Sequence, residues 1–203
     1  MPSPTRPVDA ADLVLAFANT HADGGGRPER FVDVDGLRAW LMETGLHEAA
    51  DDVTAADVDG VRHLRDAVVT VLLVHANDPA TNEAALAQAE ADVRRAGARH
   101  PLITSVDHAG VRLAPAQGGF PGAVGSVLAA MTDLALTGTW SRLKACRNQP
   151  CHMAFFDRSR NTSGAYCSPG CSSQVAMRAY RQRRAAEPGR PAGHDRVEPE
   201  ENP

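Results

Sequence analysis

Residues 146–171 read CRNQPCHMAFFDRSRNTSGAYCSPGC and contain all four cysteines of this 203-residue chain. The cysteines form two close pairs, with the spacing Cys146-x4-Cys151-x15-Cys167-x3-Cys171. Tetrahedral zinc suits such a pattern, because each pair can chelate from one tight turn and the loop between them brings the pairs together. Two disulfides or free structural thiols are the alternatives. The spacing favours one zinc ion bound by all four cysteines.

The number of candidate ligands also indicates what the metal does. Four protein ligands close the coordination sphere and leave no position for an activated water, so we expect a structural zinc ion. His152 is a further candidate, but it directly follows Cys151 and cannot easily chelate from the same turn. Phe155 and Phe156 could stack on bases, although a place in the small core of the zinc module is the plainer interpretation.

The segment after the fourth cysteine, SSQVAMRAYRQRRAAE (172–187), is rich in helix-forming residues. At 100° per residue, one stripe holds Gln174, Arg178, Arg181 and Gln182. The other side holds Val175, Ala176, Ala179 and Tyr180. We expect a helix that starts at the metal, with Ser172 or Ser173 as N-cap, one buried face and one basic face.

The charge of the chain is divided between its two parts. Residues 1–140 carry 10 basic and 19 acidic side chains, whereas residues 141–184 carry nine basic and one acidic. Such asymmetry suggests a polyanionic partner, above all duplex DNA, although charge pairing within the molecule would also account for it. Arginine and glutamine can read base edges in the major groove, and further arginines can neutralise phosphates. The predicted DNA contacts are Arg158, Arg160, Gln174, Arg178, Arg181, Arg183 and Arg184.

The first 140 residues are mostly helical by their apolar periodicity. The expected helices cover residues 9–19, 34–45, 54–75, 81–99 and 121–137. Thr54 and Asp57 form a helix-start capping pattern, and residues 102–106 and 111–113 flank a glycine turn that predicts a hairpin.

These elements predict an α+β protein with two parts. A mostly helical N-terminal domain with a small β-hairpin (8–140) is followed by a treble-clef-like four-cysteine zinc module (141–187). The Pro-rich polar ends, 1–7 and 188–203, are expected to be a flexible and a disordered tail.

Composition narrows the class of protein. The chain is 43% hydrophobic and 23% charged, as in ordinary globular proteins. The longest apolar run that we identify is 68–74, far short of the roughly 18 residues that cross a bilayer, so we expect no membrane contact. Asp9 and Asp12 interrupt the region where an export signal would need an apolar run, which suggests a reducing cytoplasm and disfavours disulfides. No motif of an enzyme stands out, so we do not expect one.

Several of these segments resemble a known family. Residues 146–151, followed by FFDRSRN (155–161) and Tyr166-Cys167-Ser168, resemble the CGNR zinc finger. The run LAFANT (15–20), with later Leu37, Trp40, Leu41, Gly45 and Leu46, is similar to the start of the ABATE domain that precedes this finger in bacterial stress-induced transcriptional regulators. The resemblance covers about residues 8–184. It implies a zinc-dependent regulator that binds DNA through the finger, with the four cysteines as ligands and an N-terminal domain that senses a signal.

The sequence departs from the family at its motif. The name-giving Cys-Gly-Asn-Arg reads Cys-Ser-Ser-Gln at 171–174, the second pair is spaced one residue shorter, and Gly164-Ala165 replace arginines usual before the third cysteine. Metal binding should survive these changes. DNA contact is more affected, because the lost charges are those that a phosphate contact would use.

Other functions stay open at this point. The finger could be a zinc-stabilised protein-interaction module that has lost DNA binding, or a structural appendage of an N-terminal domain that binds or converts a small molecule. Asn19 and Thr20 could bind such a ligand, or they could end a helix and bond the loop backbone. A small-molecule effector and a homodimer are not decided by the sequence, which has no heptad pattern.

Overall fold

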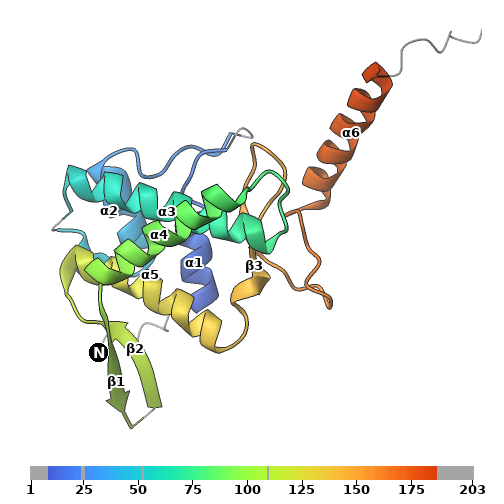
Figure 1. Cartoon of the computed structure of the whole chain (residues 1–203). Helices are drawn as coiled ribbons and strands as arrows, with labels where there is room; N and C mark the ends of the chain where they lie inside the picture. Colours follow the sequence, from blue (N-terminus) through green and yellow to red (C-terminus); the bar gives the residue numbers. More distant parts are fainter. Residues whose placement is uncertain (1–8, 24–25, 52, 109, 187–203) are drawn as a thin grey trace, which may run out of the picture.

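The computed structural model describes residues 9–23, 26–51, 53–108 and 110–186 (Figure 1). The two expected tails, 1–7 and 188–203, lie outside these ranges. The helices are α1 (Ala10–Ala18), α2 (Val34–Glu43), α3 (Ala55–His75), α4 (Glu83–Arg99), α5 (Gly119–Leu136) and α6 (Pro169–Ala186), with 3-10 turns η1 (His47–Ala49) and η2 (Trp140–Arg142). The antiparallel strand pairs are β1 (Leu102–Asp107) with β2 (Gly110–Pro115), and β3 (Leu143–Ala145) with β4 (Ala154–Phe156). The predicted α+β class, mostly helical, is confirmed.

Helix α3 runs through the body of the protein and begins with the predicted cap. The Thr54 hydroxyl accepts a hydrogen bond from the Asp57 amide (3.4 Å), and the Asp57 carboxylate accepts one from the Thr54 amide (2.9 Å). These two bonds satisfy backbone donors that the first turn of a helix leaves free. Helix α4 lies along α3 after a short connection, as the sequence indicated (Figure 1).

Three aromatic rings mark the centre of the helical core. Phe17, Phe31 and Trp40 pack with ring centroids 5.5–6.2 Å apart, at tilted or edge-to-face angles. Trp40 is 2% exposed, so the expectation that it belongs to the core is confirmed. The buried Arg65 guanidinium lies over the Phe31 ring and pairs with Glu29, which attaches the loop before α2 to α3.

Helix α5 corrects one statement of the sequence analysis. Its 18 residues pass a test of length and composition for a membrane-crossing helix although they include Asp133, so an apolar segment longer than 68–74 does exist. Half of the helix is buried inside this fold, where it packs against α1 and β2. Many of its residues are glycine, alanine and serine. The segment therefore has few large apolar side chains, and the sequence does not single it out as a long apolar run. The other described helices do not meet the same criterion.

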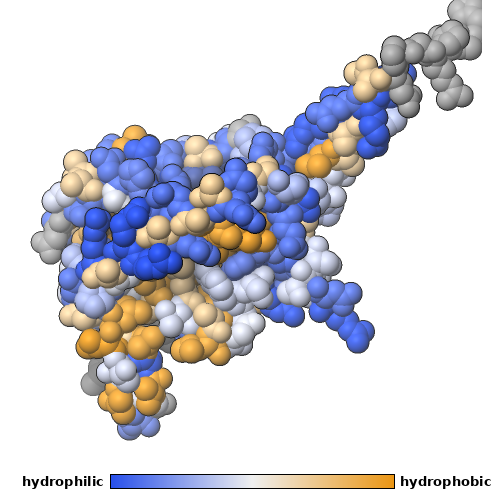
Figure 2. Space-filling model, in the orientation of Figure 1, coloured by the Kyte–Doolittle hydropathy of each residue, from blue (hydrophilic) through white to orange (hydrophobic). Residues whose placement is uncertain are grey.

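The β1–β2 hairpin projects from the body below α5 (Figure 1). Its register pairs Val106 with Val111 near the tip, and both side chains are more than 70% exposed. Figure 2 shows the hairpin as one of the most hydrophobic parts of this face of the molecule. At its base, Pro115 packs where a Cβ on Gly125 of α5 would lie, so the absence of a side chain at Gly125 permits the close approach.

The second strand pair joins the C-terminal segment to the helical core. Leu143 and Ala145 of β3 are fully buried and Ala154 of β4 is 4% exposed, and all three belong to the same apolar cluster as α1, α3 and α5. His75, at the end of α3, makes a 2.9 Å hydrogen bond through Nδ1 with the Leu143 carbonyl, and its ring meets Trp140 edge-on at 5.2 Å. The expected boundary near residue 140 therefore precedes a strand that belongs to the core.

This packing predicts that Leu143→Ala lowers the free energy of unfolding of the whole protein by about 2–5 kcal/mol, because it removes a fully buried side chain. Leu136→Ala is the matched control, since Leu136 is 77% exposed, and should change stability by about 0.5 kcal/mol or less. Urea denaturation of the zinc-loaded variants, followed by the fluorescence of Trp40 and Trp140, measures both free energies of unfolding. Equal stabilities would contradict the shared core.

Candidate zinc centre and nucleic-acid interface

The four cysteines converge at one point although they come from three parts of the chain. Cys146 follows β3, Cys151 lies in the turn that leads back to β4, and Cys167 and Cys171 flank the start of α6. All four sulfur atoms lie within 4.8 Å of one another, and Cys167 Sγ lies 3.7 Å from both Cys151 Sγ and Cys171 Sγ. A tetrahedral zinc with Zn–S bonds of about 2.3 Å requires S···S separations of about 3.8 Å. The arrangement fits that ion.

Backbone hydrogen bonds shape the two cysteine turns. The Cys146 amide donates to the Met153 carbonyl (2.9 Å), and the Cys151 amide donates to the Asn148 carbonyl (2.7 Å), which closes the first turn. At the second pair, the Cys171 amide donates to the Ser168 hydroxyl (3.2 Å). Helix α6 therefore begins at Pro169, before the fourth cysteine. The expected caps Ser172 and Ser173 are wrong, because both residues lie inside the first turns of α6.

The surroundings of the thiols shift the pKa values of three of them in different directions. Burial raises the pKa of Cys171, but hydrogen bonds from Asn148 and Ser168 outweigh it and bring this pKa down to about 7. Burial raises the pKa of Cys151 and of Cys167. One thiol is therefore readily deprotonated at neutral pH, and thiolate is the form that binds zinc.

Four thiols fill the four positions of a tetrahedral zinc ion. No coordination position is left for an activated water, so the ion is structural. None of the four cysteines is in a disulfide. His152 is not among the residues whose ligand atoms converge in the described part of the chain. It occupies a left-handed backbone conformation (φ 46°) directly after the first turn. The site thus corresponds to the predicted one.

A buried asparagine connects the first cysteine turn to α6. Asn148 is 2% exposed; its amide nitrogen donates to Gln174 (2.9 Å), and its amide oxygen accepts from the Arg178 guanidinium. Gln174 stands where the family motif has arginine, and Arg178 lies one turn further along. These two predicted DNA contacts therefore face Asn148 and orient the helix. No pattern in the sequence marked Asn148, because a single polar residue in a loop has no periodic signal.

Beyond this contact, α6 extends away from the body (Figure 1). No residue of α6 is buried in the described structure, and Met177 and Tyr180 are 50% and 48% exposed. The expected buried face of this helix is therefore wrong: its apolar residues have no surface of the described chain to cover. Arg181, Arg183 and Arg184 are exposed, the last with its guanidinium 5.9 Å from the Tyr180 ring. Figure 2 shows the helix as a largely hydrophilic projection.

Arg158 and Arg160 lie on a loop whose base is held by a buried ion pair. Lys144 Nζ donates to the Asp157 carboxylate at 2.8 Å, and the two side chains are 2% and 3% exposed. The same ammonium donates to the Gly164 carbonyl (3.1 Å), so the loop is closed at both ends. Both arginines are exposed on it. In Figure 1 the loop and α6 both lie toward the right of the molecule, with α6 pointing upward and the loop pointing downward.

Of the remaining candidate residues, Asn19 bonds the finger, and Thr20 is buried in the N-terminal domain. The Asn19 amide group makes two hydrogen bonds with the backbone of Ala154 in β4, at 2.7 and 3.0 Å. Thr20 is fully buried, and its hydroxyl donates to the Phe17 carbonyl. The following glycine-rich loop adds a third link, because the Arg27 guanidinium donates to the Cys151 carbonyl (3.2 Å).

The zinc centre predicts one Zn²⁺ per chain. Cys151→Ser removes one thiolate and should abolish stoichiometric binding, whereas His152→Ala, which alters the adjacent residue, should keep one ion per chain. Metal analysis of the purified proteins, together with the thiolate absorption of their Co²⁺ forms, gives the result. Loss of zinc in His152→Ala with retention in Cys151→Ser would overturn the assignment.

The buried ion pair predicts a stability that depends on pH. Burial by itself raises the pKa of Asp157, but Lys144 and the amides of Ser159 and Gly164 hold this pKa well below its usual range. Lys144→Met leaves the Asp157 carboxylate without its counter-ion. It should lower the free energy of unfolding by about 3–5 kcal/mol at pH 7. The difference in unfolding free energy between wild type and variant should shrink as pH falls below about 4, where Asp157 of the unfolded chain becomes protonated.

Arg30→Met is the matched control for this ion pair. Arg30 pairs with Glu43 at the surface, so its removal should cost at most about 1 kcal/mol. Urea denaturation of both variants from pH 7 to pH 3 makes the comparison. An equal loss for the two variants would show that the buried pair contributes no more than a surface pair.

Two family models match this sequence. One, described as "CGNR zinc finger", matches residues 142–184, and the other, ABATE, described as "Putative stress-induced transcription regulator", matches residues 11–138. No curated protein matches the chain. The first match contains the complete zinc centre and most of α6, and the second covers more than half of the sequence. The chain therefore belongs to the ABATE family and carries a CGNR zinc finger at residues 142–184.

Proposed function

We propose that this zinc-binding regulator binds duplex DNA in the cytoplasm, with α6 placed in a groove and the finger loop on the phosphate backbone. The projection of α6 is the observation that carries the proposal. The helix has 18 residues and would extend about 27 Å at 1.5 Å per residue, enough to follow a major groove. It contains four arginines and no acidic residue.

The arginines of the finger have two proposed roles, to orient α6 and to contact DNA. Arg178, together with Gln174, bonds Asn148 and sets the direction of the helix. Arg181, Arg183 and Arg184 are exposed further out and are the DNA contacts on the helix that we propose. Arg158 and Arg160 supply charge from the exposed loop, where phosphate contacts need no fixed base geometry.

A protein partner for α6 is the second candidate, favoured by the exposed Met177 and Tyr180. Exposed large apolar side chains on a projecting helix are typical of protein contacts. Docking of α6 on the acidic N-terminal domain of the same chain finds no support among the described residues, since the helix points away from that domain (Figure 1).

The test measures how zinc-loaded protein binds random duplex DNA by fluorescence anisotropy at several salt concentrations. The triple variant Arg181→Ala/Arg183→Ala/Arg184→Ala should bind at least about tenfold more weakly. The slope of log K against log [salt] should fall by up to about 3, because each lost phosphate contact removes about 0.9. Enrichment of the bound duplexes then shows whether a sequence is read.

Arg30→Ala/Arg94→Ala/Arg112→Ala is the control, because it removes the same charge from the N-terminal domain. It should bind DNA nearly as well as the wild type, with zinc content verified for every variant. DNA binding that is equally weakened by both triple variants would point to a general charge effect. No retention of DNA by the wild type at low salt would reject the proposed function and favour the protein partner.

A further inference from the structure

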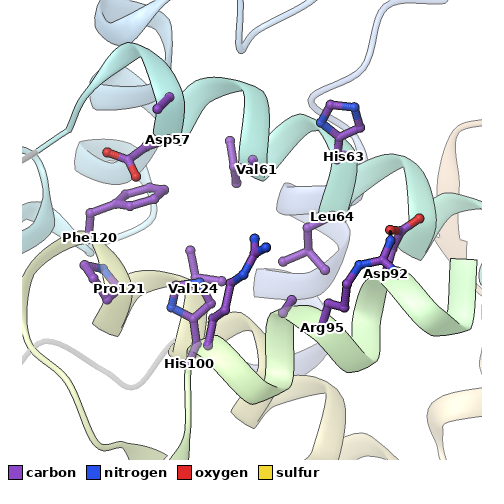
Figure 3. Close-up of a pocket in the computed structure, with 14 residues that line it drawn as sticks. Asp57, Val61, His63, Leu64, Asp92, Arg95, His100, Phe120, Pro121 and Val124 are labelled. Carbon is purple, nitrogen blue, oxygen red and sulfur yellow. Dashed lines mark hydrogen bonds and ion pairs between the residues drawn. The ribbon is translucent and has the colours of Figure 1, made fainter.

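A pocket of about 490 Å³ lies between α3, α4 and the first turns of α5, far from the zinc centre along the chain (Figure 3). Its floor is apolar and comes from Val61, Leu64, Phe120 and Val124. In Figure 3, Val61 and Leu64 point from α3 toward α4. The volume lies within the range of pockets that hold small organic ligands.

The same floor is part of the core of the domain. Its four side chains also border a void of only about 10 Å³, together with Phe17 and Trp40 of the aromatic core. Such a void is about the smallest that holds one water, so the floor is held by packing and offers a ligand a fixed apolar surface.

The acidic groups at the pocket already have partners. The Asp57 carboxylate accepts hydrogen bonds from the amide and the hydroxyl of Thr54. The Asp92 carboxylate is bonded by Arg95 and by Gln88. A cationic ligand would therefore find no free acidic side chain among these lining residues.

One cationic side chain at the pocket has no partner. The exposed Arg99 makes no hydrogen bond or ion pair with the described residues. The two histidines do not add donors. The ring of His100 bonds the Pro121 backbone and Gln117, and burial lowers its pKa, so its unpartnered Nδ1 is an acceptor; His63 donates from Nδ1 to the Asp59 carbonyl. Figure 3 shows His63 and His100 on opposite sides of the pocket. A free guanidinium beside an apolar floor is complementary to an anion that carries an apolar body.

We propose that this pocket binds a small organic carboxylate, with the carboxylate group at Arg99 and the apolar body on the floor. A bare inorganic anion would leave the floor uncovered, and a neutral apolar compound would leave the Arg99 guanidinium without a partner. The inference depends on this pocket alone and is independent of DNA binding, so each can fail without the other.

The probes are benzoate and hexanoate, titrated into zinc-loaded full-length protein while amide chemical shifts are recorded by NMR. Benzylamine and acetate are the controls, because the first has the apolar body with the opposite charge and the second has the carboxylate with almost no body. Benzoate or hexanoate should give saturable shifts at the amides that line the pocket. Benzylamine and acetate should give none at the same concentrations.

Two pairs of variants distinguish the site from non-specific binding. Arg99→Ala should weaken carboxylate binding about tenfold or more, because it removes a charge-assisted hydrogen bond, whereas Arg94→Ala on the same helix should leave it unchanged. Gly60→Leu should fill the pocket, since a Cβ there meets no atom within 4 Å, and it should also favour the helix. Gly97→Leu, equally free of contacts but outside this pocket, should bind as the wild type does.

The Gly60→Leu variant keeps the test valid if Arg99→Ala folds poorly, because added helix propensity supports the fold. Carboxylate titrations that shift no amide of the pocket would overturn the proposal. Unchanged affinity in both Arg99→Ala and Gly60→Leu would overturn it as well, since binding would then occur elsewhere.

Discussion

The burial of β3 and β4 against α1 and α3 is the constraint on which the rest of this structure depends. A short four-cysteine module has too little apolar surface for a core of its own. Here its first strand pair completes the core of the helical domain, with Leu143 and Ala145 fully buried. Polar links reinforce the joint from three positions of the N-terminal domain, namely Asn19, Arg27 and His75. The metal centre is therefore attached to a rigid body.

This joint determines where the basic helix points. The zinc centre fixes the first turn of α6 through Cys171, and Asn148 holds the second and third turns through Gln174 and Arg178. The outer part of the helix can then project without packing on the body (Figure 1). Since α6 has few other contacts, its attachment at the N-terminal end determines its direction. An isolated helix of this length is marginally stable in water, so the attachment also supports the helix itself. Helix α3 spans the same body, from the pocket at its first turns to the finger at His75.

The sequence predicted the features that depend on local chemistry. The cap at Thr54, the helical periods, the hairpin and the four zinc ligands all follow from residue types at fixed spacing. It did not predict features set by distant contacts. Strands β3 and β4 are too short for a periodic signal, and the apolar side of α6 has the pattern of a buried face although nothing in the described chain covers it. Asn19 had two interpretations, and only its partner Ala154 shows which contact it makes.

The central claim is that the finger strands and the helical domain are one cooperative unit. Native-state hydrogen exchange of the zinc-loaded protein tests it most directly, because each amide reports the free energy of the opening that exposes it. The account predicts that the Cys146 amide, bonded to the Met153 carbonyl beside β3–β4, exchanges with the same opening free energy as the buried α3 amides around Leu72. Exchange of the Cys146 amide through an opening of much lower free energy, while α3 stays protected, would contradict the claim. The finger would then be a separate unit.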